Sequence, residues 1–207
     1  MEMDDRHRAE TGAFYTPKKW ADKAVEYLLG IVPCLDGMVV YDPAAGEGAL
    51  LDALPCGTDC VGSTLESSDT ETLLRKGYTA FQFDFLHGNM RFIDDSVLEA
   101  SRGGRLIVLT NPPYRKLRNG ECELMKRVYP ECCGDATGLF LLRIMRELKP
   151  LLTCAFTKMD VYQGAGMKQF RDAFRPFERN LGMFVCPSHS WPHLKGNFPI
   201  AFSVFAG

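Results

Sequence analysis

Four consecutive residues, Asn111-Pro112-Pro113-Tyr114, have the types and the spacing to do chemistry. The apolar run at residues 106–109 predicts a buried parallel strand, so the tetrapeptide falls where open α/β sheets bind ligands. The two prolines leave the Asn111 side-chain oxygen and the Pro112 carbonyl as rigid acceptors. Such acceptors suit a planar amine, with Tyr114 stacked on the ring that carries it. The alternative is an ordinary surface turn, because Asn-Pro pairs are common in turns.

A second candidate site follows the predicted strand at residues 38–41. The segment DPAAGEG, residues 42–48, reads as a glycine turn into a short helix at residues 49–54, and such a turn lets the backbone approach a ligand closely. It lacks the lysine of the P-loop and the GxGxxG spacing. We therefore expect a ligand with a cationic amino group and little phosphate, with Asp42 accepting from the ammonium. The alternative role of Asp42 is an Asx turn.

Two further acids come at the ends of the next two predicted strands. Glu66 lies twenty residues past Gly46, after the apolar run at residues 60–62, where nucleotide-binding units usually hold a ribose diol. The strand at residues 79–83 leads to Asp84 and Phe85, an acceptor for an adenine amino group and a ring to stack on it. Each acid alone would more often be a cap or a turn residue, but three successive strand ends with an acid indicate one ligand site.

The remaining chain predicts alternating helices and strands that position these residues. Ahead of the first helix, Phe14 and Tyr15 form either a clamp for a flat ligand or part of a peripheral helix start, with Thr16 as its cap and Pro17 in its first turn. Residues 115–134 are expected to form a loop over the site, with at most one helical turn. Further helices are predicted at residues 18–29, 70–76 (capped by Ser68 or Asp69), 94–102, 139–149 (starting at Asp135 or Thr137) and 167–174, and further strands at 151–156, 181–186 and 200–205.

Length and composition predict one large α/β domain, residues 11–207, after a charged arm at residues 1–10. The 207 residues are 46% hydrophobic and 24% charged, enough for a full core. The net charge of -2 gives no global attraction to polyanions, so contact with nucleic acid would rest on local basic patches. These patches are Arg115, Lys116 and Arg118 near the tetrapeptide, and Lys168, Arg171 and Arg175 on a late helix.

Cysteine usage and hydropathy predict a cytoplasmic protein. The eight cysteines include no CxxC pair, which favours reduced thiols, and no apolar stretch approaches the length of a membrane span. Cys186, His189 and His193 have spacings that could ligate zinc, but no fourth ligand is near in the sequence. We therefore expect no metal.

In the order of its motifs, the chain resembles the amino-group DNA methyltransferases of the gamma arrangement, which make N6-methyladenine using S-adenosylmethionine. TGAFYTP (residues 11–17) matches the N-terminal cofactor motif, DPAAGEG the glycine turn and FDF (83–85) the adenine-side acid. NPPY matches the catalytic tetrapeptide and GNFPIAF (196–202) the late aromatic motif. NPPY alone is shared with protein-glutamine and ribosomal methyltransferases, whereas the flanking motifs favour the gamma DNA enzymes.

This resemblance implies a Rossmann-like class I methyltransferase fold, with a seven-stranded, mostly parallel sheet, helices on both faces and an antiparallel last strand. It implies that the cofactor is held by Thr11, Gly12, Phe14, Tyr15, Thr16, Asp42, Pro43, Ala44, Gly46, Glu66, Asp84, Phe85 and Asn111. It implies that Asn111, Pro112, Pro113 and Tyr114 hold a flipped adenine, with Lys195 and Phe198 against the base.

Members of this family usually continue into a target-recognition domain after the late aromatic motif, and this domain is expected to be absent from the present chain. DNA binding by the chain alone is then expected to be weak, with recognition supplied by a missing C-terminal part or a separate specificity subunit. Two alternatives remain open. The chain could methylate RNA or a protein glutamine, or it could be a non-catalytic, methyltransferase-like structural subunit.

Overall fold

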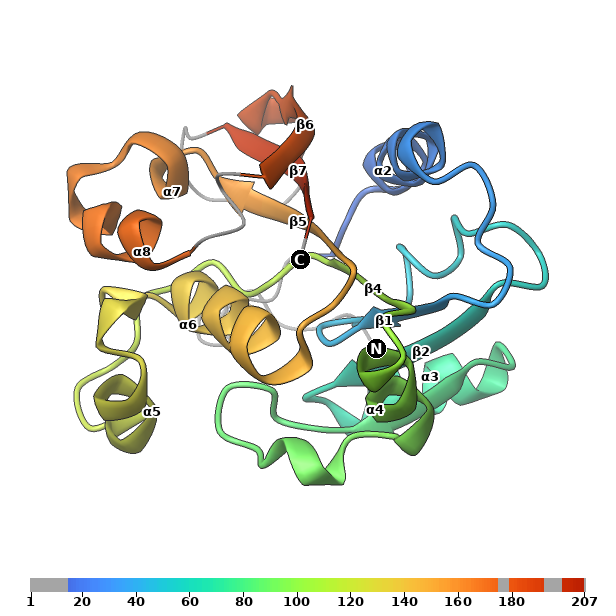
Figure 1. The fold of residues 1–207 in the computed structure, drawn as a ribbon, viewed down its shortest axis with the longest axis horizontal. Helices are drawn as coiled ribbons and strands as arrows, with labels where there is room; N and C mark the ends of the chain where they lie inside the picture. The colour runs from blue at the N-terminus through green and yellow to red at the C-terminus, as the bar shows by residue number, and fades with distance from the viewer. Residues whose placement is uncertain (1–14, 175–178, 192–198, 207) are drawn as a thin grey trace.

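The computed structural model describes residues 15–174, 179–191 and 199–206, and it contains one seven-stranded sheet (Figure 1). The strand order is β3-β2-β1-β4-β5-β7-β6, and β7 runs antiparallel to both of its neighbours. This arrangement confirms the predicted sheet and its antiparallel last strand. The strands are β1 (Val39–Asp42), β2 (Asp59–Thr64), β3 (Thr79–Gln82), β4 (Leu106–Thr110), β5 (Leu152–Lys158), β6 (Asn180–Cys186) and β7 (Ile200–Ala206).

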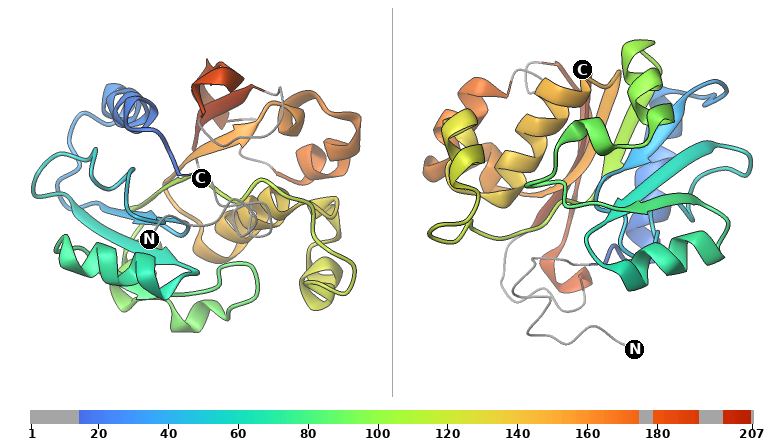
Figure 2. Two further views of the ribbon diagram at one scale, coloured as in Figure 1. Left: turned by 180° about the vertical axis from the view of Figure 1, so that it is seen from behind. Right: turned by 90° about the horizontal axis from the view of Figure 1, so that it is seen from below.

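Helices cover both faces of the sheet (Figures 1 and 2). The helices that position the site are α2 (Lys18–Ile31), α3 (Ser67–Arg75), α4 (Asp95–Arg102), α5 (Glu123–Val128), α6 (Ala136–Arg143), α7 (Asp160–Gln163) and α8 (Lys168–Ala173). One core cluster joins α2 to Ile107 and Leu109 of β4, while another joins α4, α6 and α8 to Leu106 and Val108 of the same strand. All five residues of β4 are fully buried, as expected for a parallel strand covered on both faces.

The segment after the glycine turn differs from the prediction of a helix at residues 49–54. It forms hydrogen-bonded turns, with the Gly48 amide bonded to the Ala45 carbonyl and the Asp52 amide to the Gly48 carbonyl. Glycines at positions 46 and 48 have φ +51° and +91°, outside the helical region, and Pro55 follows closely, so the segment closes as turns. Burial of Leu50 and Leu51 in the core stabilises these turns.

Two predicted helix caps are wrong. Pro17 is the N-cap residue of α2, and Thr16 instead accepts a hydrogen bond from Asn111. Helix α3 starts at Ser67 without a side-chain cap, and Asp69 is buried in its first turn. Both side chains contact residues of the site instead: Thr16 accepts from Asn111, and Asp69 accepts from the Tyr15 hydroxyl. In α4, Asp94 precedes the helix as its N-cap residue, and its carboxylate accepts from the Ser96 amide at 2.9 Å.

Residues 115–134 are more ordered than the predicted loop. They contain α5 and the 3-10 turn η2 (Pro130–Cys132), and the Leu117 amide donates to the Gly134 carbonyl. Helix α6 then begins with Asp135 as its cap, whose carboxylate accepts from the Gly138 amide at 3.2 Å. It continues as the π-helical turn η3 (Ile144–Leu148), which ends before Pro150. In the part of the chain that is described, no helix combines the length and apolar character needed to cross a bilayer.

Candidate active site

A cavity of about 350 Å³ opens at the carboxyl ends of β1, β2, β3 and β4, within the range usual for small-molecule sites. The predicted site residues that line it are Tyr15, Thr16, Asp42, Pro43, Ala44, Gly46, Glu66, Asp84, Phe85, Asn111 and Pro113. Residues not predicted to line it include Asp69, His87, Glu121 and Phe140. The three strand-end acids and the start of the tetrapeptide therefore meet in one pocket, although they are separated by up to 69 residues in the chain.

The glycine turn forms one wall of the pocket and packs against Tyr15. Gly46 has φ +51°, and a Cβ on it would lie 3.0 Å from the Tyr15 ring. The Tyr15 hydroxyl reaches across to Asp69 Oδ1 at 3.5 Å. A side chain at position 46 would push the ring away, so glycine is required both by the backbone conformation and by this contact.

Asp42 is a buried carboxyl group at the end of β1, with only 1% of its surface exposed. Its Oδ1 accepts a hydrogen bond from the Ala44 amide at 3.0 Å, which closes an Asx turn at the start of the glycine turn. Burial raises the pKa of Asp42 from 3.8 to about 7, against the opposing effect of this hydrogen bond. A carboxyl group in this state would gain from a cation placed beside it in the pocket.

Two acids, and not one, follow β2 at the pocket wall. Glu66 is the N-cap residue of α3, and Asp69 lies three residues later on the same helix face. The pKa of Asp69 is raised, first by burial and then by the nearby carboxylates of Glu47 and Glu66. The spacing of three residues between Glu66 and Asp69 could have indicated that both line the pocket. Asp69 was instead predicted as a possible helix cap.

Asp84 and Phe85 follow β3, and the chain itself fixes their positions. Asp84 Oδ1 accepts from the amides of Leu86 and His87 at 2.9 and 3.2 Å, and Oδ2 lies 2.6 Å from His87 Nδ1. The Phe85 ring is buried against Phe140, with centroids 4.4 Å apart. The loop after β3 is thus a rigid wall that places one carboxylate and one aromatic ring at the pocket.

Arg143 of α6 binds the loop after β3, a role that was not predicted from the sequence. It is 1% exposed, and its guanidinium donates to the carbonyls of Phe85 and Gly88, the latter at 2.7 Å. The same guanidinium pairs with Glu147 at 2.6 Å. A buried arginine with all of these partners positions the Phe85 segment, and nothing in the local sequence of α6 indicates it.

Asn111 lies at the end of β4, and both polar atoms of its side-chain amide are hydrogen-bonded. Its Nδ2 donates to Thr16 Oγ1 at 3.1 Å, and its Oδ1 accepts from the Tyr114 hydroxyl. The Pro113 carbonyl is bonded by Thr137 at 2.8 Å, whereas no described residue donates to the Pro112 carbonyl. The pattern leaves Pro112 as the backbone acceptor of the tetrapeptide.

Tyr114 does not line the pocket. Its ring is 6% exposed and belongs to the core on the α2 side, and burial holds the pKa of its hydroxyl well above the ordinary value. Lys158 of β5 donates to the Tyr114 carbonyl at 3.4 Å. The predicted stacking of Tyr114 on a base therefore requires a different position of the ring from the one observed.

Several predicted residues lie outside the described part of the chain. They are Thr11, Gly12, Phe14, Arg175, His193, Lys195 and Phe198. Of the three residues whose spacing could ligate zinc, the described Cys186 is fully buried and His189 lies in the 3-10 turn η6 (Ser188–Ser190).

Both predicted basic patches are largely paired within the protein. Arg115 binds Glu121 through both terminal nitrogens at 2.6 and 2.8 Å, and Lys116 lies 3.1 Å from Asp135. On the other patch, Lys168 pairs with Asp172 at 2.6 Å. The Arg171 guanidinium donates hydrogen bonds to the carbonyls of Val161 and Gly164, at 3.2 and 2.8 Å. The surface charge available to a polyanion is therefore smaller than the sequence indicates.

Comparison with known proteins places the fold. No protein-family model and no curated protein matches the chain. A modification subunit assigned to a type I restriction enzyme of Vibrio vulnificus matches with TM-score 0.65 and 17% identity, over 97% of this chain and 46% of the other. A type I restriction-modification methyltransferase subunit from Streptococcus thermophilus matches with TM-score 0.68 and 18% identity, over 93% and 44%. A protein of Listeria monocytogenes assigned as a class I S-adenosylmethionine-dependent methyltransferase matches with TM-score 0.67 and 15% identity, over 93% and 61%.

These likenesses define the class of fold. The chain has the class I S-adenosylmethionine-dependent methyltransferase fold, which confirms the fold predicted from the resemblance of its motifs. It spans less than two thirds of the length of each of the three structures.

Proposed function

We propose that the chain is the catalytic part of a methyltransferase that transfers the methyl group of S-adenosylmethionine to the N6 amino group of adenine in DNA. The observation that carries the proposal is the position of Asn111. Its amide is oriented by Thr16 at the end of β4, at the wall of a pocket that also contains three strand-end acids. A side-chain acceptor and the adjacent Pro112 carbonyl suit the two hydrogens of an amine.

The residues of the pocket fit the proposed cofactor. Asp42 is a buried carboxyl group suited to the ammonium, and Glu66 follows β2 at the place for a ribose. Asp84 and Phe85 supply an acceptor and a ring for the adenine. Gly46 has no side chain, so the cofactor could approach the backbone of the turn closely. When bound, the cofactor supplies an electrophilic methyl group on its sulfonium.

The tetrapeptide would activate the attacking amine. The adenine amino group is planar because its lone pair is conjugated, and hydrogen bonds from its two hydrogens to Asn111 Oδ1 and the Pro112 carbonyl favour a tetrahedral nitrogen. The bond to Thr16 engages the NH2 group of Asn111, so its oxygen is the atom that would accept from the substrate. Because Asn111 Oδ1 has two lone pairs, it can accept from the amine while the Tyr114 hydroxyl is still bonded. Positioning and electrostatics would supply the rate.

Target recognition is proposed to lie elsewhere, in a C-terminal part or a separate specificity subunit. The two basic patches are largely paired within the protein, and few free cations mean weak, salt-sensitive binding of DNA. Base flipping also costs a few kcal/mol and needs a surface that grips the duplex on both sides of the target. We therefore expect the chain alone to bind DNA weakly and without sequence choice.

Binding and transfer are tested separately. Calorimetry with S-adenosylmethionine should show binding to the parent and to Asn111→Ala, and much weaker binding to Asp84→Ala. Labelled cofactor is then incubated with DNA, RNA and protein pools, and the methylated product is identified by mass spectrometry. We expect N6-methyladenine in DNA, lost in Asn111→Ala. Label in RNA or in a protein glutamine would change the substrate, and cofactor binding without transfer to any pool, even with a specificity partner present, would favour a structural subunit.

A further inference from the structure

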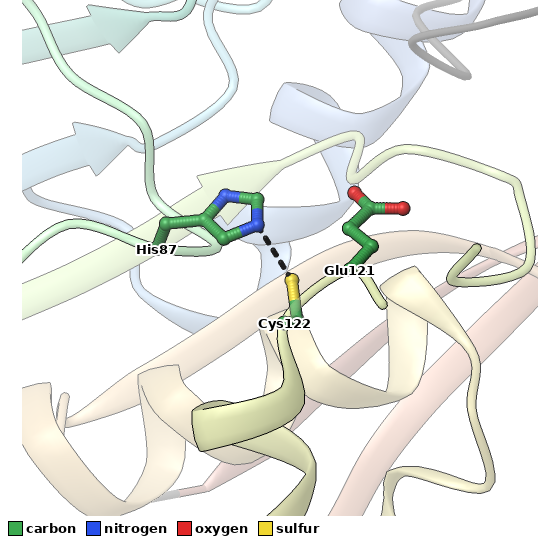
Figure 3. A group of neighbouring side chains, drawn as sticks. All are labelled: His87, Glu121 and Cys122. Atoms are coloured by element: carbon green, nitrogen blue, oxygen red, sulfur yellow. Dashed lines mark hydrogen bonds between the residues drawn. The ribbon is translucent and has the colours of Figure 1, made fainter. Parts of the chain in front are cut away.

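A cluster of metal-ligating side chains lies at the rim of the pocket, outside the residues proposed to bind cofactor or base. His87 follows β3, while Glu121 and Cys122 immediately precede α5 (Figure 3). One ligand atom from each of the three residues lies within 4.8 Å of the other two. Cys122 Sγ is 2.8 Å from His87 Nε2. These residues are 35 positions apart in the chain, so the cluster exists only in the folded protein.

The geometry points to a site for a thiophilic divalent cation, Zn²⁺, held by Cys122 Sγ, His87 Nε2 and a Glu121 carboxylate oxygen. Sulfur, imidazole nitrogen and carboxylate oxygen are the ligand types of protein zinc sites, and three protein ligands leave one position open. Tetrahedral bonds of about 2.0–2.3 Å place ligand atoms roughly 3.3–3.7 Å apart. The sulfur and nitrogen would separate by less than about 1 Å, and the glutamate oxygen would close by a similar amount.

The surroundings of the cluster complete such a site. Asp84 Oδ2 lies 2.6 Å from His87 Nδ1, on the ring nitrogen that does not face the cysteine. This carboxylate-histidine pairing fixes the ring and directs Nε2 to a metal, as the second layer of known zinc sites does. Glu121 also binds Arg115, but its Oε1 accepts only one described hydrogen bond, from Arg115 Nη2 at 2.6 Å. One lone pair of that oxygen therefore remains for a cation.

The charges of the cluster also balance. A cysteine thiolate and the Glu121 carboxylate offset the two positive charges of the ion, and the thiol proton is released to solvent on binding. The nearby charges of Arg115 and Asp84 offset each other. An ion here would join the loop after β3 to the start of α5, and so would fasten the segment at residues 115–134 over the pocket. The metal site itself does not depend on the proposed methyl transfer.

Cobalt(II) is the probe, because cobalt bound to thiolate absorbs strongly in the near ultraviolet. The parent for the experiment carries Cys34→Ser and Cys56→Ser, which remove the two exposed thiols. After reduction and chelation, we expect this protein to bind one Co²⁺ with the thiolate band, and Zn²⁺ to displace it. Cys122→Ser should abolish the band, and His87→Gln should weaken Co²⁺ binding at least tenfold. Asp84→Asn should retain the band with affinity reduced by about 10–100-fold, because it supports His87 and does not ligate.

Thermal unfolding with and without Zn²⁺ checks that the variants are folded and provides a second measurement. Zn²⁺ should raise the Tm of the parent, and it should raise the Tm of His87→Gln by clearly less at the same concentration. A folded parent that shows neither the band nor a Tm shift, or a band that persists in Cys122→Ser, would overturn the proposal. Metal binding that is equal in the parent and His87→Gln would also overturn it, because it would place the ion at another thiol.

Discussion

The buried carboxyl group of Asp42 makes the stability of the protein depend on pH in a direction opposite to that of most acids. Its pKa is raised from 3.8 to about 7 by burial, so the folded state favours the protonated form. The cost of ionising Asp42 in the folded state is absent below about pH 4. It grows between about pH 4 and 7 and is constant above that range, so stability from this group is lost as pH rises.

Replacing Asp42 by Asn isolates this cost. An asparagine cannot ionise, and its side-chain oxygen can still accept from the Ala44 amide that Asp42 binds at 3.0 Å. A pKa shift of about three units corresponds to about 4 kcal/mol, an upper limit because relaxation around the charge reduces it. The free energy of unfolding of Asp42→Asn should therefore equal that of the parent near pH 4, and exceed it by up to about 4 kcal/mol at pH 8.

Urea unfolding followed by circular dichroism at pH 4 to 8 measures this difference. Because both proteins share every other acid, only the difference between them reports on Asp42. A difference that stays constant with pH, or that favours the parent at pH 8, would refute the reasoning.

The same variant tests the proposed contact with the cofactor ammonium. An ammonium beside Asp42 favours the ionised form, so the affinity of the parent for S-adenosylmethionine should rise between pH 6 and 8. In Asp42→Asn the affinity should be lower at pH 8 and nearly independent of pH over this range. Methylthioadenosine, which lacks the amino acid, is the matched control and should bind both proteins equally. Equal loss of both ligands would show that Asp42 shapes the turn and does not bind the ammonium.

Three further substitutions test the positioning of the site. Thr16→Val removes the acceptor that orients Asn111, so methyl transfer should fall about tenfold, consistent with one hydrogen bond, while Thr16→Ser should restore it. Tyr114→Phe removes the hydroxyl bonded to Asn111 Oδ1, so methyl transfer should fall about fivefold because the amide loses one orienting hydrogen bond. An unchanged rate would show that Tyr114 does not help to orient Asn111. Arg143→Met leaves the carbonyls of Phe85 and Gly88 without their buried donor and should cost about 2–4 kcal/mol in urea unfolding, with Arg143→Lys recovering part.

The strand ends of this fold could be predicted from the sequence because their signals are local. Each apolar run is buried by helices on both faces, and the residue after it must emerge at the same edge of a parallel sheet. That logic located Asp42, Asp84 and Asn111, and the structure places all three at one pocket. The number of strands and the antiparallel direction of the last strand were predicted from the resemblance of the motifs and not from the runs themselves, and the order of the strands was not predicted.

Contacts between distant segments could not be predicted in this way. Local sequence predicts that Thr16 and Asp69 cap helices, and the structure shows that neither does. A capping hydrogen bond contributes only about 1 kcal/mol, and the contacts of these side chains in the pocket outweigh it. Arg143 and the pair of His87 and Cys122 have no local signal at all. Their partners are set by how α6 and the segment before α5 pack onto the loop after β3.

Tyr114 shows how such packing bears on the chemistry. Its ring is buried and cannot stack on a base in the pocket from that position, so its two proposed roles, at Asn111 and against the base, belong to different ring positions. Exposing an aromatic side chain costs about 2–3 kcal/mol, and losing the bond to Asn111 adds about 1 kcal/mol. Stacking on a base returns about 1–3 kcal/mol. The costs, about 3–4 kcal/mol together, equal or exceed this return, so stacking alone does not draw the ring out of the core and Tyr114 acts on the chemistry through its bond to Asn111.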